Sequence, residues 1–371
     1  MAPWIVQGDM MNGYQLTKIR IAGFKSIEKM ELDMAMLNVF IGSNGAGKTN
    51  LISLFSFLQA MLEGRLQLYI AKHGGPDAFL YWGRQRTENI RAEFYFGING
   101  YGFELEPTND NKMMFADEWF YWNMLGEKHI GAGHMESAWK TGTHSGIDQY
   151  VQSILSGQKW RVYHFHDTSD TAKVKQIHGL NDNIELAMDA RNLAAFLYRL
   201  RQTAEDSYAQ ITSAIRLTAP YFDDFILRSN PLKPDSIVLE WKASGSDIPF
   251  NASQLSDGTL RFICLATLLL QPEELKPETI LIDEPELGLH PYAVAVLAGM
   301  IKKAAVNSQI IVSTQSVELL NEFSAENVVV VEHDMETSEF IRLDAKRLAN
   351  WLQDDYTLGD LWKHNLLGGR P

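Results

Sequence analysis

Cysteine is nearly absent from this 371-residue chain, in which Cys264 is the only one. A single cysteine excludes a disulfide framework. Cys264 lies in the apolar run ICLATLLL, where we expect it to be a small core residue and not a nucleophile. This run is the longest apolar stretch, and it is far shorter than the roughly 20 residues that cross a bilayer.

Other scarce features narrow the class of protein further. The N-terminal stretch MAPWIVQGDM lacks the basic and then apolar pattern of a signal peptide, so we expect a cytoplasmic protein without membrane insertion. The chain has no low-complexity segment and no repeat at the period of a solenoid. With 46% hydrophobic and 21% charged residues, the composition is that of a globular protein.

Basic residues are fewer than acidic residues, with 33 Lys and Arg against 46 Asp and Glu. The net charge of −13 repels nucleic acid and disfavours strong non-specific binding to it. Short basic clusters such as GRQR and YRLRQ leave a local basic groove open, although solvated surface is their simpler interpretation.

The pattern of apolar residues predicts an α/β fold. The stretch IRAEFYFGINGYGFELE predicts a β-hairpin with Phe94, Phe96 and Ile98 on one face and a turn at Asn99-Gly100. The apolar runs TILID, QIIVS and NVVVVE alternate with helices, as in a parallel sheet that is buried on both faces. We therefore expect a mainly parallel central sheet and an N-terminal antiparallel β lobe.

We expect a mostly helical region to be inserted between an N-terminal and a C-terminal lobe. Apolar residues at helical spacing between Asp189 and Pro220 predict one or two helices there, with Asp189 as the N-cap. The predicted division is 1–105 for the N-terminal lobe, 106–235 for the insertion and 236–371 for the C-terminal lobe.

The stretch GSNGAGKT follows an apolar strand and opens a helix, which is the context of a phosphate-binding loop (P-loop). Its glycines let backbone N–H groups turn toward phosphate oxygens at the positive end of the helix. Lys48 would neutralise the β- and γ-phosphates of ATP, and the Thr49 hydroxyl would bind Mg²⁺. The predicted nucleotide-binding residues of the loop are Gly42, Ser43, Asn44, Gly45, Ala46, Gly47, Lys48 and Thr49.

The stretch TILIDEPELGLHP brings Asp283 and Glu284 to the end of a buried strand. Two adjacent carboxylates in this place are costly without a cation or a chemical role. Asp283 would hold Mg²⁺, and Glu284 would act as the general base toward water. Taken alone, the acidic pair before Pro285 could also be a helix N-cap.

The stretch SQLSDGTLRF begins a long apolar helix at Ser256 and Asp257. The serine hydroxyl and the free N–H groups, including that of Gly258, could bind a phosphate at this helix terminus. From this segment alone, an ordinary Ser/Asp N-cap is the favoured interpretation.

The motifs GSNGAGKT, LSDGT, LIDEPELGLHP and STQS, in this order, resemble the ATP-binding-cassette (ABC) class of P-loop ATPases. FKSI, NLAAFLYRLR, LSDGTLRF and the LLGGRP tail resemble its RecF/SMC/OLD-like branch, so the resemblance covers nearly the whole chain. It implies a head-to-tail homodimer with two ATP molecules between its subunits. Ser256 and Gly258 of one subunit would then contact the γ-phosphate held by the other.

The resemblance also implies roles for four further residues. Asn44 would reach the γ-phosphate and Lys25 of FKSI would lie near the nucleotide, with plain surface placement as the alternative for each. Gln85 is the candidate for the glutamine that senses Mg²⁺ and water. Gln315 stands where the wider class has histidine, and an amide can donate to a phosphate but cannot become cationic. We therefore expect slow hydrolysis.

His164, His166 and Asp167 in VYHFHDTS suggest a metal site, because alternation along a strand puts both histidines on one face. No fourth ligand is near in the sequence, so an ordinary strand end is the favoured interpretation.

The resemblance implies an Mg²⁺-dependent ATPase with a role in DNA transactions, repair or phage defence. DNA and a separately encoded effector protein are the partners that are compatible with this resemblance. The ATPase subunit of a membrane transporter is one alternative, and the LSDGT wording and Gln315 disfavour it. An ATP-gated scaffold with little turnover is another, and Glu284 argues against it.

Overall fold

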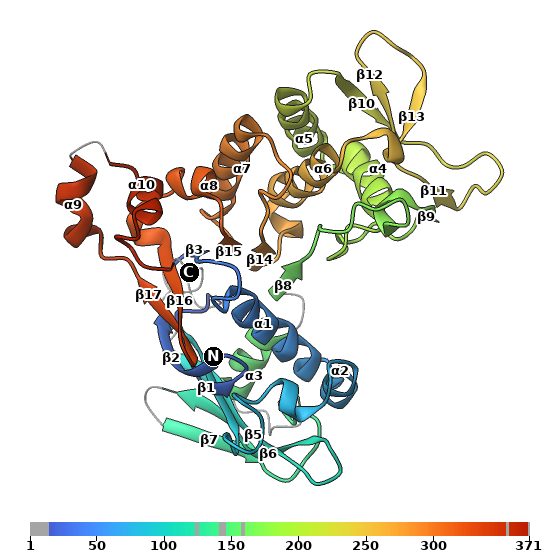
Figure 1. Ribbon diagram of the computed structural model, residues 1–371. Coiled ribbons are helices and arrows are strands. Elements are labelled where there is room, and N and C mark those ends of the chain that lie inside the picture. The colour runs from blue at the N-terminus through green and yellow to red at the C-terminus, as the bar shows by residue number, and fades with distance from the viewer. Residues whose placement is uncertain (1–14, 123–125, 141–145, 157–159, 354–355, 370–371) are drawn as a thin grey trace. The chain divides into compact units, whose positions relative to one another are not determined.

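The computed structural model describes residues 15–122, 126–140, 146–156, 160–353 and 356–369 (Figure 1). The chain forms two compact units. Unit 1 comprises residues 1–160 and 324–371, and unit 2 comprises residues 161–323. The N-terminal stretch that bears on targeting, and the last two residues of the LLGGRP tail, lie outside the described residues.

Unit 1 contains an antiparallel sheet, which confirms the predicted N-terminal β lobe. In spatial order its strands are β2 (Ile27–Asp33), β1 (Lys18–Phe24), β4 (Ile90–Phe96), β5 (Asn99–Pro107), β6 (Met113–Trp122) and β7 (Gly126–Gly131). Alternation along β4 buries one face, where Phe94 packs against Phe103. The sheet continues past residue 105, the predicted start of the insertion, because β6 and β7 extend it by further antiparallel pairing.

The predicted hairpin is present, but its turn lies two residues earlier than expected. Phe96 pairs with Asn99, so Gly97 and Ile98 form the turn and Asn99 opens β5. Gly97 has a φ of +59°, and a positive φ at the first turn residue is the conformation that glycine adopts most easily. Ile98 is consequently exposed and does not share the buried face of Phe94.

Unit 1 also holds the strand, loop and helix that the P-loop sequence predicts. β3 (Leu37–Ile41) is fully buried and runs parallel to β16 (Val328–Asp334), which pairs antiparallel with β17 (Thr337–Arg342). The helices of this unit are α1 (Lys48–Leu62), α2 (Leu66–Lys72), α3 (Gly146–Leu155), α9 (Ala345–Gln353) and α10 (Leu358–Lys363). Helix α1 follows β3 directly, and α3 packs against β5 and β6.

Unit 2 is built around the parallel pair β14 (Thr279–Asp283) and β15 (Gln309–Thr314). Its other strands are β8 (Trp160–Tyr163, starting at the unit boundary), β9 (His178–Gly179), β10 (Phe222–Ile226), β11 (Ser236–Ile237), β12 (Glu240–Ala243) and β13 (Pro249–Asn251). Its helices are α4 (Leu193–Thr203), α5 (Glu205–Thr218), α6 (Asp257–Leu270), α7 (Pro291–Ala304) and α8 (Val317–Asn321). Parallel pairs flanked by helices confirm the α/β class.

The helical stretch before Pro220 forms two helices, α4 and α5, which meet at Ala204. The residue preceding α4 is Asn192 rather than Asp189, since the helix begins only after Ala190, which has a φ of +53°. Helix α6 is almost wholly buried, and Cys264 on it is 2% exposed, which confirms its predicted place in the core. Among the described residues, no helix is both long enough and apolar enough to span a membrane.

Candidate functional site

The P-loop in unit 1 has a defined conformation between β3 and α1. Gly45 and Gly47 have φ values of +83° and +115°, which other residues rarely adopt. A Cβ atom on Gly47 would also collide with the Ser338 side chain. Lys48 is buried, and its Nζ donates hydrogen bonds to the carbonyl oxygens of Gly42 (2.6 Å) and Ser43 (2.9 Å). The loop therefore holds the ammonium group against its own backbone.

Asn44 and Thr49 lie on the exposed side of this loop. A turn of this kind, which leads into a helix N-terminus, can direct backbone N–H groups at an anion. The side chains of Asn44 and Thr49 are free to approach a bound phosphate and its metal ion. Their contacts with nucleotide stay predictions.

The FKSI segment lies against the first turn of α1. Ser26 Oγ accepts hydrogen bonds from Asn50 Nδ2 and from Ser338 Oγ, both at 2.7 Å. Lys25 has a φ of +50°, and its ammonium group lies 5.4 Å from the centre of the Phe79 ring. Partial burial lowers the pKa of the Lys25 ammonium. The segment of Lys25 is thus next to the P-loop helix, and the proximity of Lys25 to the nucleotide stays a prediction.

Asp283 and Glu284 lie at the end of β14 in unit 2. Asp283 is opposite Ser313 in β15, and the Ser313 hydroxyl donates a hydrogen bond to its carboxylate. The Glu284 N–H donates to the Ser313 carbonyl at 2.9 Å. Glu284 has a φ of +40°, a strained conformation for a residue with a side chain and one that is concentrated at functional sites.

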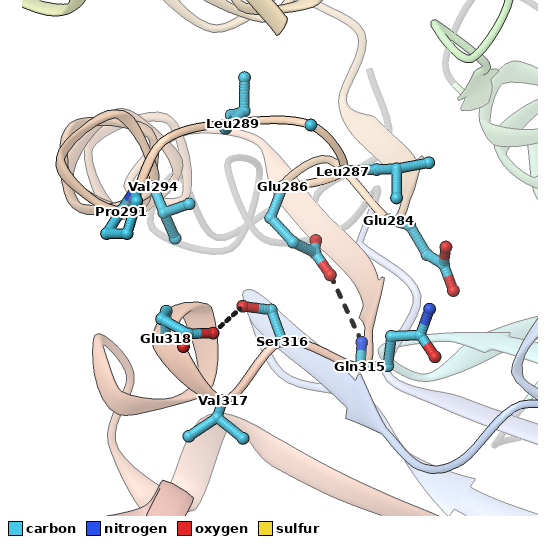
Figure 2. A pocket seen from close by; sticks show the side chains of 11 residues that line it. Glu284, Glu286, Leu287, Leu289, Pro291, Val294, Gln315, Ser316, Val317 and Glu318 are labelled. Atoms are coloured by element: carbon cyan, nitrogen blue, oxygen red, sulfur yellow. Dashed lines mark hydrogen bonds between the residues drawn. The ribbon is translucent and has the colours of Figure 1, made fainter.

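A pocket of 360 Å³ in unit 2 is lined by two of the predicted catalytic residues (Figure 2). Glu284 and Gln315 both line it, and Figure 2 shows the Glu284 carboxylate and the Gln315 amide turned toward one another. Glu286 and Glu318 add two further carboxylates to its wall. The parallel pairing of β14 with β15 explains this meeting, because the carboxyl ends of parallel strands lie at one edge of the sheet.

Glu286 is a residue of this pocket that the sequence reasoning did not identify. It is buried, and its Oε1 accepts hydrogen bonds from the Thr314 hydroxyl and from the Gln315 N–H. The Thr314 hydroxyl in turn accepts a hydrogen bond from the Ser316 N–H at 2.9 Å. Burial raises the pKa of the Glu286 carboxyl. Glu286 therefore connects the acidic strand end to the backbone that carries Gln315.

The LSDGT segment forms the N-terminus of α6, also in unit 2. Ser256 is the N-cap, and its Oγ accepts a hydrogen bond from the Thr259 N–H at 3.2 Å. A Cβ atom on Gly258 would collide with the Gly288 carbonyl, so glycine allows α6 to pack closely on that backbone. The ordinary N-cap is thus present. The Ser256 side chain is exposed, and its contact with a phosphate stays a prediction.

Arg261, one turn further along α6, ties this helix to two neighbouring segments. Its guanidinium group donates hydrogen bonds to the carbonyl oxygens of Phe165 (3.1 Å), His166 (3.3 Å) and Leu287. Arg261 is buried, and five N–H donors in a fixed plane suit it to several acceptors at once. The LSDGT helix and the ELGLH segment therefore form one connected structure.

A family model described as "AAA domain, putative AbiEii toxin, Type IV TA system" matches residues 37–115 and 145–321. These ranges include the P-loop, the LSDGT helix, the acidic strand end and Gln315. The chain belongs to this family.

Curated relatives of this AAA-domain protein include phosphate import ATP-binding proteins. PstB from Ehrlichia ruminantium strain Gardel and PstB from strain Welgevonden are each 31% identical to it over 99 residues. The match covers 25% of this chain and spans only 38% of the length of each relative.

Solved structures of SMC heads share the fold over most of the chain. A crystal structure of an SMC head bound to the C-winged helix domain of ScpA has a TM-score of 0.60 at 16% identity, covering 90% of this chain and 99% of that one. An SMC head with an extended coiled coil from Pyrococcus furiosus has a TM-score of 0.55 at 16% identity, with coverages of 92% and 99%. This AAA-domain protein therefore has the fold of an SMC head.

Gln85 lies away from the contacts described above. It is exposed in a turn of unit 1 between Arg84, which pairs with Asp77 at 3.0 Å, and Arg86, which pairs with Glu336. Its role as the glutamine that senses Mg²⁺ and water stays a prediction.

The two histidines of VYHFHDTS follow the end of β8 at Tyr163. Their ring centres lie 6.4 Å apart. Partial burial lowers the pKa of His164, and the negative charge of Asp283 opposes this effect. In the part of the chain that the structure describes, no group of three or more His, Cys, Asp or Glu side chains is arranged to hold a metal ion. His164 nevertheless experiences the field of a predicted Mg²⁺ ligand, which its sequence context did not reveal.

Proposed function

We propose that this ABC/SMC-like ATPase binds ATP with Mg²⁺ and hydrolyses it. The preformed P-loop, in which Lys48 is held on the carbonyls of Gly42 and Ser43, carries the proposal. Backbone N–H groups of the loop and Lys48 would bind the phosphates, and Thr49 and Asp283 are the residues that would hold the metal ion. When bound, the metal ion would supply positive charge that offsets the negative charge of the phosphates.

Glu284 acts as the general base, and the amide of Gln315 donates to the γ-phosphate. Their meeting in one pocket supports this assignment, as does the strained backbone of Glu284. An uncharged amide stabilises a developing negative charge less than a cationic imidazole does. The enzyme therefore hydrolyses ATP slowly.

ATP binding joins two copies of the chain. Ser256 and Gly258 of one copy contact the nucleotide on the P-loop of the other, and hydrolysis releases the dimer. The exposed N-cap hydroxyl and the free N–H groups at the start of α6 support this role, since a helix N-terminus attracts anions.

The cycle serves DNA transactions, repair or phage defence in the cytoplasm, together with a separately encoded effector. The resemblance of the motifs to the RecF/SMC/OLD-like branch supports the first two roles. The family description, with its putative toxin of a toxin–antitoxin system, supports the third. With a net charge of −13, DNA binding requires a local basic surface that outweighs the overall field.

Binding to DNA should therefore depend on both salt and nucleotide. Fluorescence anisotropy with labelled duplex and single-stranded DNA should show tighter binding with a non-hydrolysable ATP analogue than without nucleotide. The affinity should fall steeply with salt, with a log–log slope of about −0.9 for each duplex phosphate contacted. Absence of binding to either DNA at low salt, with the analogue present, would contradict a DNA role and favour a protein partner.

The match to PstB favours one alternative, a transporter ATPase. It rests on 25% of the chain, whereas the SMC-head fold extends over 90%. A neighbouring gene for a membrane-spanning subunit would support the transporter, and ATP hydrolysis stimulated by DNA would argue against it.

A further inference from the structure

The LLGG segment (Leu366–Gly369) near the C-terminal end has no part in the roles proposed above. It follows α10, which is anchored in unit 1 by the buried side chains of Leu358 and Leu361. The Leu366 N–H donates to the Leu361 carbonyl at 2.8 Å, which ends the helix. Gly368 and Gly369 then have φ values of +79° and +77°, so the chain makes a turn that glycine alone adopts readily.

This turn places the LLGG segment directly on the start of the P-loop. The Ser43 N–H donates a hydrogen bond to the Gly369 carbonyl at 2.8 Å. A Cβ atom on Gly369 would lie 2.8 Å from Val330 Cγ1 and 3.5 Å from Gly42 Cα. Gly369 is buried, and it fits this position only because it has no side chain.

Glu332 of β16 holds the segment from the other side. Its Oε1 accepts a hydrogen bond from the Gly369 N–H at 2.6 Å, a short bond of the charge-assisted kind. A Cβ atom on Gly368 would collide with the same carboxylate. Both backbone groups of Gly369 are therefore engaged, one with the sheet and one with the P-loop.

Ser43, which is hydrogen-bonded to Gly369, and its neighbour Gly42 are the residues whose carbonyls hold Lys48. Gly42 and Ser43 accept hydrogen bonds from Lys48 Nζ, and Gly42 itself fits tightly against the Val331 carbonyl of β16. A shift of Gly42 or Ser43 would therefore move the carbonyls that orient the ammonium group. The path from Gly369 to Lys48 runs through the hydrogen bond from the Ser43 N–H and then through the adjacent carbonyls of Ser43 and Gly42.

We propose that the LLGG segment is a positioning element of the nucleotide site, which fixes Gly42 and Ser43 so that Lys48 and the loop N–H groups meet the phosphates. This inference rests on the proposed binding of ATP by the P-loop. The segment touches the loop backbone and acts on the nucleotide through it.

Substitution of Gly369→Ala should weaken the affinity for Mg-ATP about tenfold, the effect expected when a buried hydrogen bond is displaced. Gly245→Ala is the matched control, because Gly245 has the same φ of +77° and a Cβ atom there meets nothing within 4 Å. Both variants bear the same backbone strain. Only Gly369→Ala should change the dissociation constant in calorimetry. A fall in melting temperature that both variants share reports the backbone strain alone.

A second pair of variants tests the same inference independently if Gly369→Ala folds poorly. Glu332→Gln retains an oxygen that can accept from the Gly369 N–H, so it should bind Mg-ATP within about twofold of wild type. Glu332→Ala removes the acceptor and should weaken binding about as much as Gly369→Ala. Glu339→Ala, an exposed carboxylate opposite Glu332 on β17, should have no effect.

Lys48→Ala separates failure of this inference from failure of the proposed function. If Lys48→Ala abolishes binding while Gly369→Ala, or Glu332→Ala in its place, binds as wild type does, the LLGG segment has no positioning role. If Lys48→Ala binds Mg-ATP normally, the P-loop assignment itself is wrong. Weaker binding by Gly369→Ala or Glu332→Ala, with normal binding by Gly245→Ala and Glu332→Gln, supports the inference.

Discussion

Lys48→Ala is expected to weaken ATP binding by at least about a hundredfold, since charge-assisted hydrogen bonds to phosphate contribute about 1.5–3 kcal/mol each. The ammonium group lies on the Gly42 and Ser43 carbonyls, at the loop whose N–H groups would surround the phosphates. Alanine is a good helix former at the first residue of α1, so the fold should remain intact. Isothermal calorimetry with Mg-ATP measures the change directly.

Lys72→Ala is the matched control for this prediction. Lys72 is an exposed lysine at the end of α2, and its loss should leave the dissociation constant unchanged. Circular dichroism and melting curves should show that both variants are folded. A Lys48→Ala chain that binds ATP as tightly as wild type would rule out the assignment of GSNGAGKT as the phosphate site.

Glu284→Gln should slow hydrolysis by roughly 10²–10⁴-fold, the range that a general base contributes, while ATP is still bound. The amide keeps the size of the side chain but cannot take a proton from water. In the proposed cycle hydrolysis releases the dimer, so this variant should accumulate as a dimer when Mg-ATP is added. Phosphate release gives the rate, and light scattering gives the mass.

Glu318→Gln is the control here, because Glu318 is an exposed carboxylate that lines the same pocket. It should hydrolyse ATP at nearly the wild-type rate. If Glu284→Gln also retained that rate, the base would have to be another group. Glu286, which is buried and engaged with Thr314, would then be the next carboxylate to test.

The local parts of the site could be predicted from the sequence. A P-loop is recognisable because its glycines, lysine and threonine are consecutive and stand between a buried strand and a helix. Asp283 and Glu284 are recognisable because they end an apolar strand, and Ser256 because it precedes an apolar helix. In each case, the residues that determine the conformation are within a few positions of each other.

The parts that depend on contacts distant in sequence could not be predicted. Glu286 meets Thr314, and Gly369 meets Ser43, only because parallel strands and a returning tail bring them together. The signal for Glu286 was a third carboxylate in DEPE. The signal for the tail was its pair of glycines, which mark a turn but not its partner.

Errors within the β lobe have a similar cause. Asn-Gly is the stronger turn signal in isolation, but pairing of Phe96 with Asn99 moves the turn to Gly97 and Ile98. The extent of the sheet beyond residue 105 depends on β6 and β7, whose pairing is a tertiary property.

Mixing two inactive variants, Lys48→Ala and Ser256→Arg, tests most directly whether ATP acts between two copies of the chain. Each homodimer has a lesion in both of its sites. In a two-fold dimer with trans sites, the heterodimer gathers both lesions in one site and leaves the other whole. Half of the dimers are mixed, so hydrolysis should return to roughly a quarter of the wild-type rate if the sites act independently.

Binding of a non-hydrolysable ATP analogue should be measured on the same mixture, because strict coupling between sites would suppress hydrolysis alone. Subunit exchange is checked with two differently tagged chains. Recovery of hydrolysis or of tight analogue binding upon mixing is the result that a shared site predicts. If exchange is demonstrated and neither recovers, Ser256 does not serve the ATP of a second copy and is only the N-cap of α6.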